Sequence, residues 1–261
     1  MTKPLTVWLT RPNAWKVRFN CISMFSLLVV CVLEELEVPY QIESFKFDDV
    51  KKKPFIDVNP NGRVPAIVDP NTNLTLWESG AIIQYLEEVY DTEKRLTYDT
   101  LNERHLLNQY LHFQMSGQGP YYGVATWFTV LHSEDLPSAR SRYHEQARRV
   151  LGVLDGLLEG KKWLVGDKCT FADLSFLPWN CRLDTFLGED PLAKYPNVLA
   201  WHQRMEARPS WKRSMEIRDK LMDEQGLQPN GMPKGIFNME QYQEFMAKSP
   251  EDQQKHLELQ K

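Results

Sequence analysis

The sequence predicts an N-terminal α/β domain followed by an all-helical domain. Segments with the alternating, β-rich pattern of strands occur only in the first third of the chain. Beyond Thr97 this pattern stops, and apolar residues recur with helical spacing. The 261 residues are enough for two domains. We expect these domains over residues 1–92 and 100–220, followed by a linker and a partly helical tail over 226–261.

The N-terminal domain is predicted to alternate strands and helices. Residues 5–9 alternate and favour a strand, and Pro12-Asn13-Ala14 favours a turn into a helix that ends near Pro39. A second strand, a loop, a pair of short strands and a last helix follow. This order is that of a thioredoxin-like domain. The later elements are expected over 40–47, 66–68, 74–77 and 78–90.

The second domain is predicted to contain helices only. Thr170 and Asp173 form a capping-box-like start before an apolar run, so that helix is expected at the centre of the domain. Ser249 is a candidate cap for a helix in the tail. Helices are expected over 100–115, 121–132, 136–158, 170–187 and 196–219.

Net charge and cysteine spacing argue against a nucleic-acid-binding protein and against a metal site. The net charge is −4, so no basic surplus favours nucleic acid as a partner. The cysteines Cys21, Cys31, Cys169 and Cys181 form no Cys-x-x-Cys pair and have no metal-ligand spacing with a histidine. We therefore expect reduced cysteines, a cytoplasmic location and no metal site.

One apolar segment raises the question of a membrane span. Cys21 to Leu33 is almost wholly apolar, but its 13 residues are fewer than the ~20 that a bilayer requires. Glu34 and Glu35 follow it instead of a small-residue cleavage site. The segment is predicted to be a buried helix, with no membrane partner.

The strongest local signal is a turn followed by two strands and a helix start. Asn59-Pro60-Asn61-Gly62 favours a turn, and Val64 is extended because Pro65 follows it. The second strand ends at Glu78-Ser79, where serine is suited to cap a helix whose free N–H groups attract a carboxylate. An open backbone edge beside an anion-binding helix start suits a small acidic peptide.

These residues and several others resemble cytosolic glutathione transferases. Within that family they are similar to the fungal group around the yeast nitrogen-regulator prion protein and to the bacterial nu-class enzymes. The resemblance covers about residues 4–220 and implies the glutathione transferase fold, with glutathione as co-substrate. Its markers are Arg11 to Val17, Leu33-Glu34-Glu35-Leu36, Asn59 to Ala66, Trp77-Glu78-Ser79, Gln114 to Pro120 and Thr170 to Asp173.

The resemblance implies how glutathione is held. Pro65 should follow a cis peptide bond and present the backbone of Val64 to the cysteinyl part of glutathione, like an added strand. Ser79 and its helix start should take the γ-glutamyl carboxylate, and Glu78 should face the ammonium group. Arg63 is a further candidate for the carboxylates.

Basic residues before this loop are also candidates. Lys52 or Lys53 is expected near the glycyl carboxylate of glutathione. The alternative for the run Lys51-Lys52-Lys53 is a plain solvated loop.

The catalytic position departs from many transferases. No Tyr, Ser or Cys stands in the loop Thr10 to Trp15. The resemblance implies that Asn13 contacts the glutathione sulfur, with Thr10 as a helper. A hydrogen bond from either side chain lowers the thiol pKa from ~8.5 and favours the thiolate. The alternative for Asn13 is a turn residue.

The acceptor pocket is predicted from aromatic and flexible residues. The segment Gln114 to Pro120 ends a helix, with Gly119-Pro120 as the stop, and the resemblance places it beside the active-site cleft. Core packing is the alternative for each aromatic. The pocket candidates are Trp15, Met115, Tyr121, Tyr122 and Trp127.

The first helix is longer than the family pattern. Fifteen residues, Arg18 to Val32, separate Lys16-Val17 from Leu33-Glu34-Glu35-Leu36, where the family has only a few. The explanations are a retained intron, or alternatively a genuine longer helix or a bulged loop.

Three functions compete. The first is a glutathione transferase that conjugates a small hydrophobic electrophile. The second keeps glutathione but performs cis/trans isomerisation of a polyene in a fungal natural-product pathway. The third is a glutathione-dependent disulfide reductase or a non-catalytic regulator. A homodimer is expected from the resemblance in each case.

Overall fold

The computed structural model describes residues 2–10, 24–46, 49–228, 232–237 and 239–260. Its described residues fall into two compact units. One unit comprises Met1–Val30, Val38–Ser79 and Arg213–Lys261, and the other comprises Cys31–Glu37 and Gly80–Lys212. The fold combines a mixed α/β domain with a helical one, as the sequence predicts.

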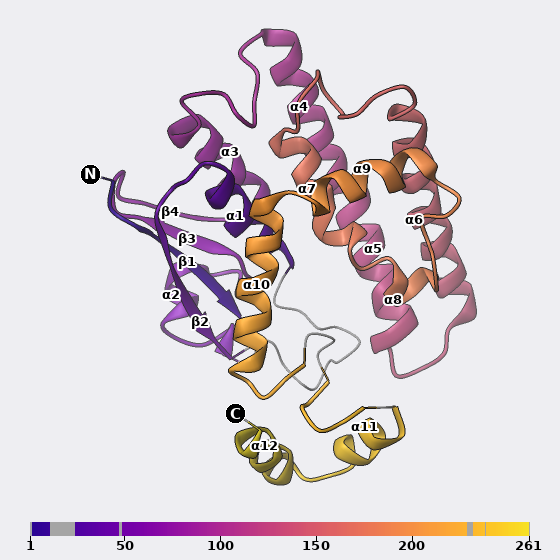
Figure 1. Cartoon of the computed structure of the whole chain (residues 1–261). Coiled ribbons are helices and arrows are strands. Elements are labelled where there is room, and N and C mark those ends of the chain that lie inside the picture. Colours follow the sequence, from indigo (N-terminus) through magenta and orange to yellow (C-terminus); the bar gives the residue numbers. More distant parts are fainter. Residues whose placement is uncertain (1, 11–23, 47–48, 229–231, 238, 261) are drawn as a thin grey trace. The chain divides into compact units, whose positions relative to one another are not determined.

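The first unit is built on a sheet with strand order β2-β1-β3-β4 (Figure 1). Strands β1 and β2 run parallel, whereas β3 is antiparallel to both β1 and β4. Side chains alternate along β1, so Leu5, Val7 and Leu9 are wholly buried. The strand bounds are β1 Leu5–Thr10, β2 Tyr40–Phe45, β3 Ala66–Asp69 and β4 Leu74–Trp77.

The turn between β3 and β4 is held by a side chain. Oδ1 of the buried Asp69 accepts a hydrogen bond from the backbone N–H of Asn71 at 2.7 Å. Asn73 takes a positive φ of 56°, which asparagine tolerates better than most residues. The hairpin therefore ends in a short asparagine-rich turn that brings β4 back along β3.

The apolar run before Glu34 is a buried helix, as predicted. Helix α1 covers Met24–Glu35, and each residue from Leu27 to Leu33 is at most 2% exposed. No helix among the described residues is long and apolar enough to cross a membrane. Part of the predicted helix, with the turn before it, falls in 11–23, outside the described residues. Helix α2 covers Phe55–Val58, and α3 covers Ser79–Tyr90, which lies in the second unit from Gly80 onward.

Helix α7 lies at the centre of the helical unit, as its apolar sequence predicts. All of its residues except Trp179 are buried. Asp173 accepts a hydrogen bond from the backbone N–H of Thr170 at 2.8 Å, which confirms the predicted reach-back to the helix start. The helices that begin in this unit are α4 Leu101–Phe113, α5 Gly119–Thr126, α6 Pro137–Leu157, α7 Phe171–Asn180, α8 Asp184–Leu187, α9 Pro196–Glu206 and α10 Pro209–Asp223.

Gly119-Pro120 does not stop a helix, contrary to the prediction. A π-helical turn, η3 over Gln114–Gln118, joins α4 directly to α5. The N–H of Gly119 bonds to the carbonyl of Gln114, five residues back. Pro120 consequently falls in the first turn of α5, where its missing N–H costs little. A second π-helical turn, η4 over Trp127–Leu131, follows α5.

Two predicted long helices are divided. The segment 170–187 breaks into α7 and α8 around Cys181 to Leu183. The segment 196–219 breaks at Ala207-Arg208, because Pro209 disfavours helical geometry at the residue before it and starts α10 instead.

The C-terminal segment contains two short helices and its own apolar cluster. Helix α11 covers Met239–Met246 and α12 covers Pro250–Leu259. Ser249 caps α12, since its side chain accepts a hydrogen bond from the N–H of Asp252 at 3.2 Å. The clustered residues are Met222, Leu227, Ile236 and Phe245, with Tyr242 and Leu257 packed against them.

Candidate glutathione site

The buried side chain of Asn59 bridges the loop before β3. Its Oδ1 accepts a hydrogen bond from the N–H of Asn61 at 2.9 Å, and its Nδ2 donates to the carbonyl of Arg63 at 2.5 Å. Gly62 has a φ of 61° and would place a Cβ 3.1 Å from the carbonyl oxygen of Val50. Glycine is favoured here both by its backbone conformation and by the lack of space.

The backbone of Val64 is available for a ligand. The Val64–Pro65 peptide bond is cis, as expected, and Pro65 is buried. The ladder between β1 and β3 ends at Trp8 and Ala66, so Val64 lies beyond it. Within the described ranges, neither the N–H nor the C=O of Val64 bonds to another residue. An extended peptide has a free donor and a free acceptor to pair with at this point.

The end of β4 leads directly into α3. Glu78 has a positive φ of 71° and is exposed, and its carboxylate forms no ion pair with any described residue. Ser79 is half-buried and begins α3. Because the first N–H groups of a helix lack helical partners and carry a partial positive charge, this position favours a carboxylate.

The basic candidates lie on the surface of the same unit. Arg63 is exposed. Lys53 is exposed and forms an ion pair with Asp57 at 3.3 Å. Lys52 pairs with Asp49 at 2.8 Å. Such exposed pairs are weak, so both lysines can exchange these partners for a ligand carboxylate.

Of the two residues predicted to contact the glutathione sulfur, the structure describes only Thr10. Thr10 ends β1 and is 1% exposed, and its hydroxyl has no hydrogen-bond partner among the described residues. Asn13 and Trp15 lie outside the described residues. A buried hydroxyl at a strand end, without a protein partner, is a suitable donor to a ligand.

Comparison with known proteins decides the family. Residues 22–89 match the family described as the glutathione S-transferase N-terminal domain, and residues 124–209 match its C-terminal domain. The glutathione S-transferase-like protein tpcF of Aspergillus fumigatus is 44% identical over 199 residues, which are 72% of this chain and 88% of that protein. The chain belongs to the glutathione transferase family.

Solved structures of glutathione transferases share the fold. The transferase URE2P8 of Phanerochaete chrysosporium, crystallised with oxidised glutathione, matches with a TM-score of 0.75 and 38% identity, over 85% of this chain and 98% of that one. Ure2p5 of the same organism, crystallised with 1-(S-glutathionyl)-2,4-dinitrobenzene, matches with a TM-score of 0.72 and 32% identity, over 84% and 96%. Glutathione is thus the co-substrate of the family.

The predicted acceptor residues of this chain do not share one environment. Met115 and Trp127 are 43% and 48% exposed. Tyr121 is half-buried beneath Arg149, whose guanidinium carbon lies 5.8 Å from the ring centroid. Tyr122 is wholly buried and packs against Phe186, with the two ring centroids 5.4 Å apart. Burial raises the pKa of the Tyr122 hydroxyl, and we assign this residue to the core instead of the pocket.

A buried polar network in the helical unit escaped the sequence analysis. The Nε2 of Gln118 donates hydrogen bonds to the carbonyl of Phe176 at 3.3 Å and to Oδ1 of Asn180 at 2.9 Å. Gln114 donates to Gln118 at 3.2 Å. These glutamines stand on η3, and π-helical turns are frequent at functional sites. The four-residue spacing of Gln114 and Gln118 is visible in the sequence, but their partner on α7 is not.

Proposed function

We propose that this chain binds glutathione at the loop Arg63 to Pro65 and at Glu78-Ser79, and activates its thiol for attack on a small hydrophobic electrophile. The observation that carries the proposal is that the backbone of Val64, beside the cis bond to Pro65, has no hydrogen-bond partner among the described residues. The cysteinyl residue of glutathione pairs with this backbone as a short added strand.

The two ends of glutathione then meet opposite charges. The γ-glutamyl carboxylate binds the hydroxyl of Ser79 and the first N–H groups of α3. The carboxylate of Glu78 faces the γ-glutamyl ammonium group. Arg63 and Lys53 offer positive charge to the glycyl carboxylate. Opposite charges at both ends fix the direction of the peptide and thereby the position of its sulfur.

Attack on an electrophile requires glutathione in its thiolate form. In this proposal Asn13 and Thr10 donate hydrogen bonds to the sulfur and lower its pKa. The thiolate attacks an electrophilic carbon, a carbon–sulfur bond forms, and either a leaving group departs or the resulting carbanion takes a proton. Trp15, Met115, Tyr121 and Trp127 are proposed to contact the apolar acceptor. The glutathionyl-dinitrobenzene bound by Ure2p5 is a conjugate of this type.

The proposed location and oligomeric state are those that the family resemblance implies. The transferase acts in the cytoplasm as a homodimer. Sedimentation of the purified chain measures the dimer directly, and a monomer at micromolar concentration would contradict it.

Calorimetry of glutathione binding tests the site. We expect Ser79→Ala to weaken binding about tenfold or more, because a hydrogen bond to a charged group contributes ~1.5–3 kcal/mol. Ser138→Ala is the matched control, since Ser138 stands exposed in the first turn of α6. Asn13→Ala should bind glutathione normally but raise the pKa of the bound thiol. Unchanged binding in Ser79→Ala would remove this residue from the site.

Product analysis tests the reaction. The chain is incubated with glutathione and a chlorodinitrobenzene, and separately with a cis-configured conjugated alkene. Conjugation consumes glutathione and replaces the chlorine of the arene with a glutathionyl group, so chloride is released and the product mass rises by glutathione minus HCl. Isomerisation changes the product geometry while the glutathione concentration stays constant. A chain that binds glutathione and performs neither reaction contradicts the enzyme proposal.

A further inference from the structure

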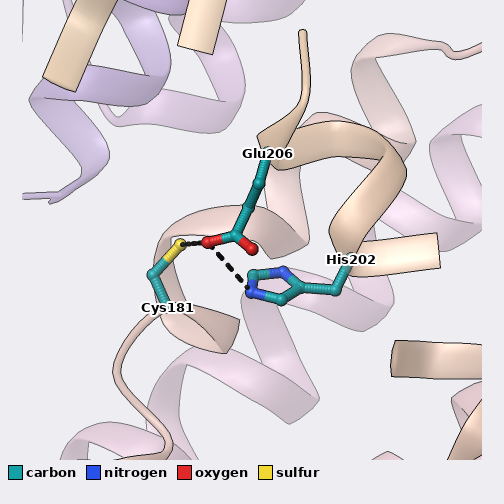
Figure 2. Close-up of side chains that lie close together, drawn as sticks. All are labelled: Cys181, His202 and Glu206. Carbon is teal, nitrogen blue, oxygen red and sulfur yellow. Dashed lines mark hydrogen bonds and ion pairs between the residues drawn. The ribbon is translucent and has the colours of Figure 1, made fainter. Parts of the chain in front are cut away.

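Three side chains with metal-ligating atoms gather in the helical unit (Figure 2). Cys181 directly follows α7, and His202 and Glu206 stand one turn apart on α9. The Sγ of Cys181 lies 3.7 Å from Oε1 of Glu206, and Nε2 of His202 lies 3.4 Å from the same oxygen. All three ligand atoms lie within 4.8 Å of one another.

We propose that Cys181, His202 and Glu206 bind a divalent zinc ion. Zinc binds sulfur at ~2.3 Å and nitrogen or oxygen at ~2.0–2.2 Å in a tetrahedron, so its ligand atoms lie roughly 3.3–3.7 Å apart. The two separations of 3.4 and 3.7 Å already match this spacing. A small movement of Cys181 toward His202 would bring Sγ and Nε2 to the same spacing, and the three atoms would then form one face of the tetrahedron.

The ligand types select the metal. A thiolate, an imidazole and a carboxylate together suit zinc, whereas calcium and magnesium require oxygen ligands. Without metal, the thiol and the imidazole N–H both donate to Glu206. Metal binding displaces the thiol proton and moves the imidazole proton to Nδ1. The divalent charge then balances the thiolate and the carboxylate.

A cleft of about 420 Å³ provides room for a fourth ligand. The three proposed ligands line it together with Asp184, Asp190 and Asn180. Asn180 is 4% exposed, and its Nδ2 has no hydrogen-bond partner in the part of the chain that the structure describes. Three protein ligands and an open position are typical of zinc sites that keep a water molecule. In this proposal Asn180, which lines the same cleft, contacts that water.

The same three residue types also occur as a cysteine nucleophile with its base, but this geometry does not favour that role. A nucleophile needs the imidazole within hydrogen-bond reach of the sulfur. Here the Cys181 thiol donates to Oε1 of Glu206, and Nε2 of His202 lies 3.4 Å from the same oxygen. The shared carboxylate gathers the three atoms around one point, as a metal ion requires.

Nδ1 of His202 sets the expected strength of the site. This atom is buried and lacks a hydrogen-bond partner among the described residues. Most metal-bound histidines donate their second N–H to an acceptor, and loss of such a partner weakens metal binding about 10–100-fold. We therefore expect weaker binding than at closed structural zinc sites.

Cobalt titration of the full chain tests the proposal. After removal of metals with a chelator, Co²⁺ is added and visible and near-ultraviolet absorbance is recorded. We expect one equivalent to bind, with tetrahedral d–d bands and a thiolate charge-transfer band, and Zn²⁺ to abolish both. Cys181→Ala should remove the charge-transfer band. Cys169→Ala, which changes a buried cysteine outside the cluster, should retain it.

Two further variants distinguish ligand loss from misfolding. Glu206 has a side chain that is 44% exposed, so Glu206→Gln should fold normally while it weakens binding by more than about 100-fold. His112→Asn changes an exposed histidine outside the cluster and should bind cobalt as the wild type does. Zn²⁺ should raise the unfolding midpoint of the wild type but not of Glu206→Gln. Absence of a one-equivalent cobalt spectrum, or a charge-transfer band that survives Cys181→Ala, would overturn the proposal.

Discussion

Arg208 holds the carboxylate of Glu35 with both arms of its guanidinium. Nε donates to Oε1 at 2.6 Å, and Nη2 donates to Oε2 at 2.7 Å. The hydroxyl of Ser210 also donates to Oε1. The side chain of Glu35 is only 12% exposed, so the pair is largely shielded from water. Two parallel charge-assisted bonds in this setting tie the end of α1 to the start of α10.

Arg208→Ala should destabilise the protein by ~2–4 kcal/mol, because it leaves a mostly buried carboxylate without its counter-ion. Urea denaturation measures the change. Arg140→Ala is the control, since it breaks an exposed pair with Asp135 and should cost less than ~1 kcal/mol. Equal losses in the two variants would show that the Glu35 pair is no stronger than a surface pair.

The contribution of Glu35 to the free energy of unfolding should depend on pH. Burial alone would raise the pKa of Glu35, but hydrogen bonds from Arg208 and Ser210 outweigh it and hold the pKa below its ordinary value of 4.5. The folded state therefore binds fewer protons than the unfolded state. The stability from this group is complete above 4.5 and is lost as pH falls through the lower folded value.

Denaturation of wild type and Glu35→Gln across the acid range measures this effect. We expect the difference in unfolding free energy to stay constant near neutral pH and to shrink below 4.5. A difference that grows on acidification would contradict a lowered pKa.

The described cysteines should differ sharply in reactivity. Burial raises the pKa of the Cys31 thiol to about 12, and it raises the pKa of Cys169 well above its ordinary value. Almost no thiolate is present at either site at neutral pH. Cys181 is partly exposed. Iodoacetamide should label Cys181 in the native protein and the buried pair only after unfolding, as peptide mass spectrometry would reveal; native labelling of Cys31 would refute this order.

Phe245→Ala should loosen the C-terminal segment. Phe245 is 1% exposed at the centre of the cluster with Met222, Leu227 and Ile236, and removal of a buried phenylalanine costs ~3–5 kcal/mol. Hydrogen exchange across α11 and α12 should accelerate, while the strands of the sheet keep their protection. Phe237→Ala, at a residue 78% exposed, is the control and should leave exchange unchanged. Faster exchange throughout the chain would instead make the cluster part of the global fold.

Thr10→Val tests the proposed helper at the sulfur. Because the hydroxyl is buried without a partner among the described residues, its removal should change stability by less than ~1 kcal/mol. The pKa of bound glutathione should rise, as measured by the ultraviolet absorbance of the thiolate. Thr6→Val is the control on the same strand, since Thr6 already bonds Gln41 at 2.9 Å. A thiol pKa that does not move would exclude Thr10.

Local sequence determined the elements whose partners lie within a few residues. The turn built on Asn59, the reach-back from Asp173 to Thr170 and the cap at Ser249 all join residues two to four positions apart. Backbone geometry and short side chains suffice to form them. The cis bond before Pro65 was foreseen from the family pattern, not from such local chemistry.

Tertiary structure alone decided the contacts between distant segments. Glu35 and Arg208 are 173 residues apart, and the break before Pro209 that positions Arg208 lay inside a predicted helix. Cys181 meets His202 and Glu206 only because α7 and α9 pack together. Periodicity shows that α9 carries a histidine and a glutamate one turn apart, but it contains no information on which helix end faces them. Those choices come from how complete helices pack, which no short stretch of sequence encodes.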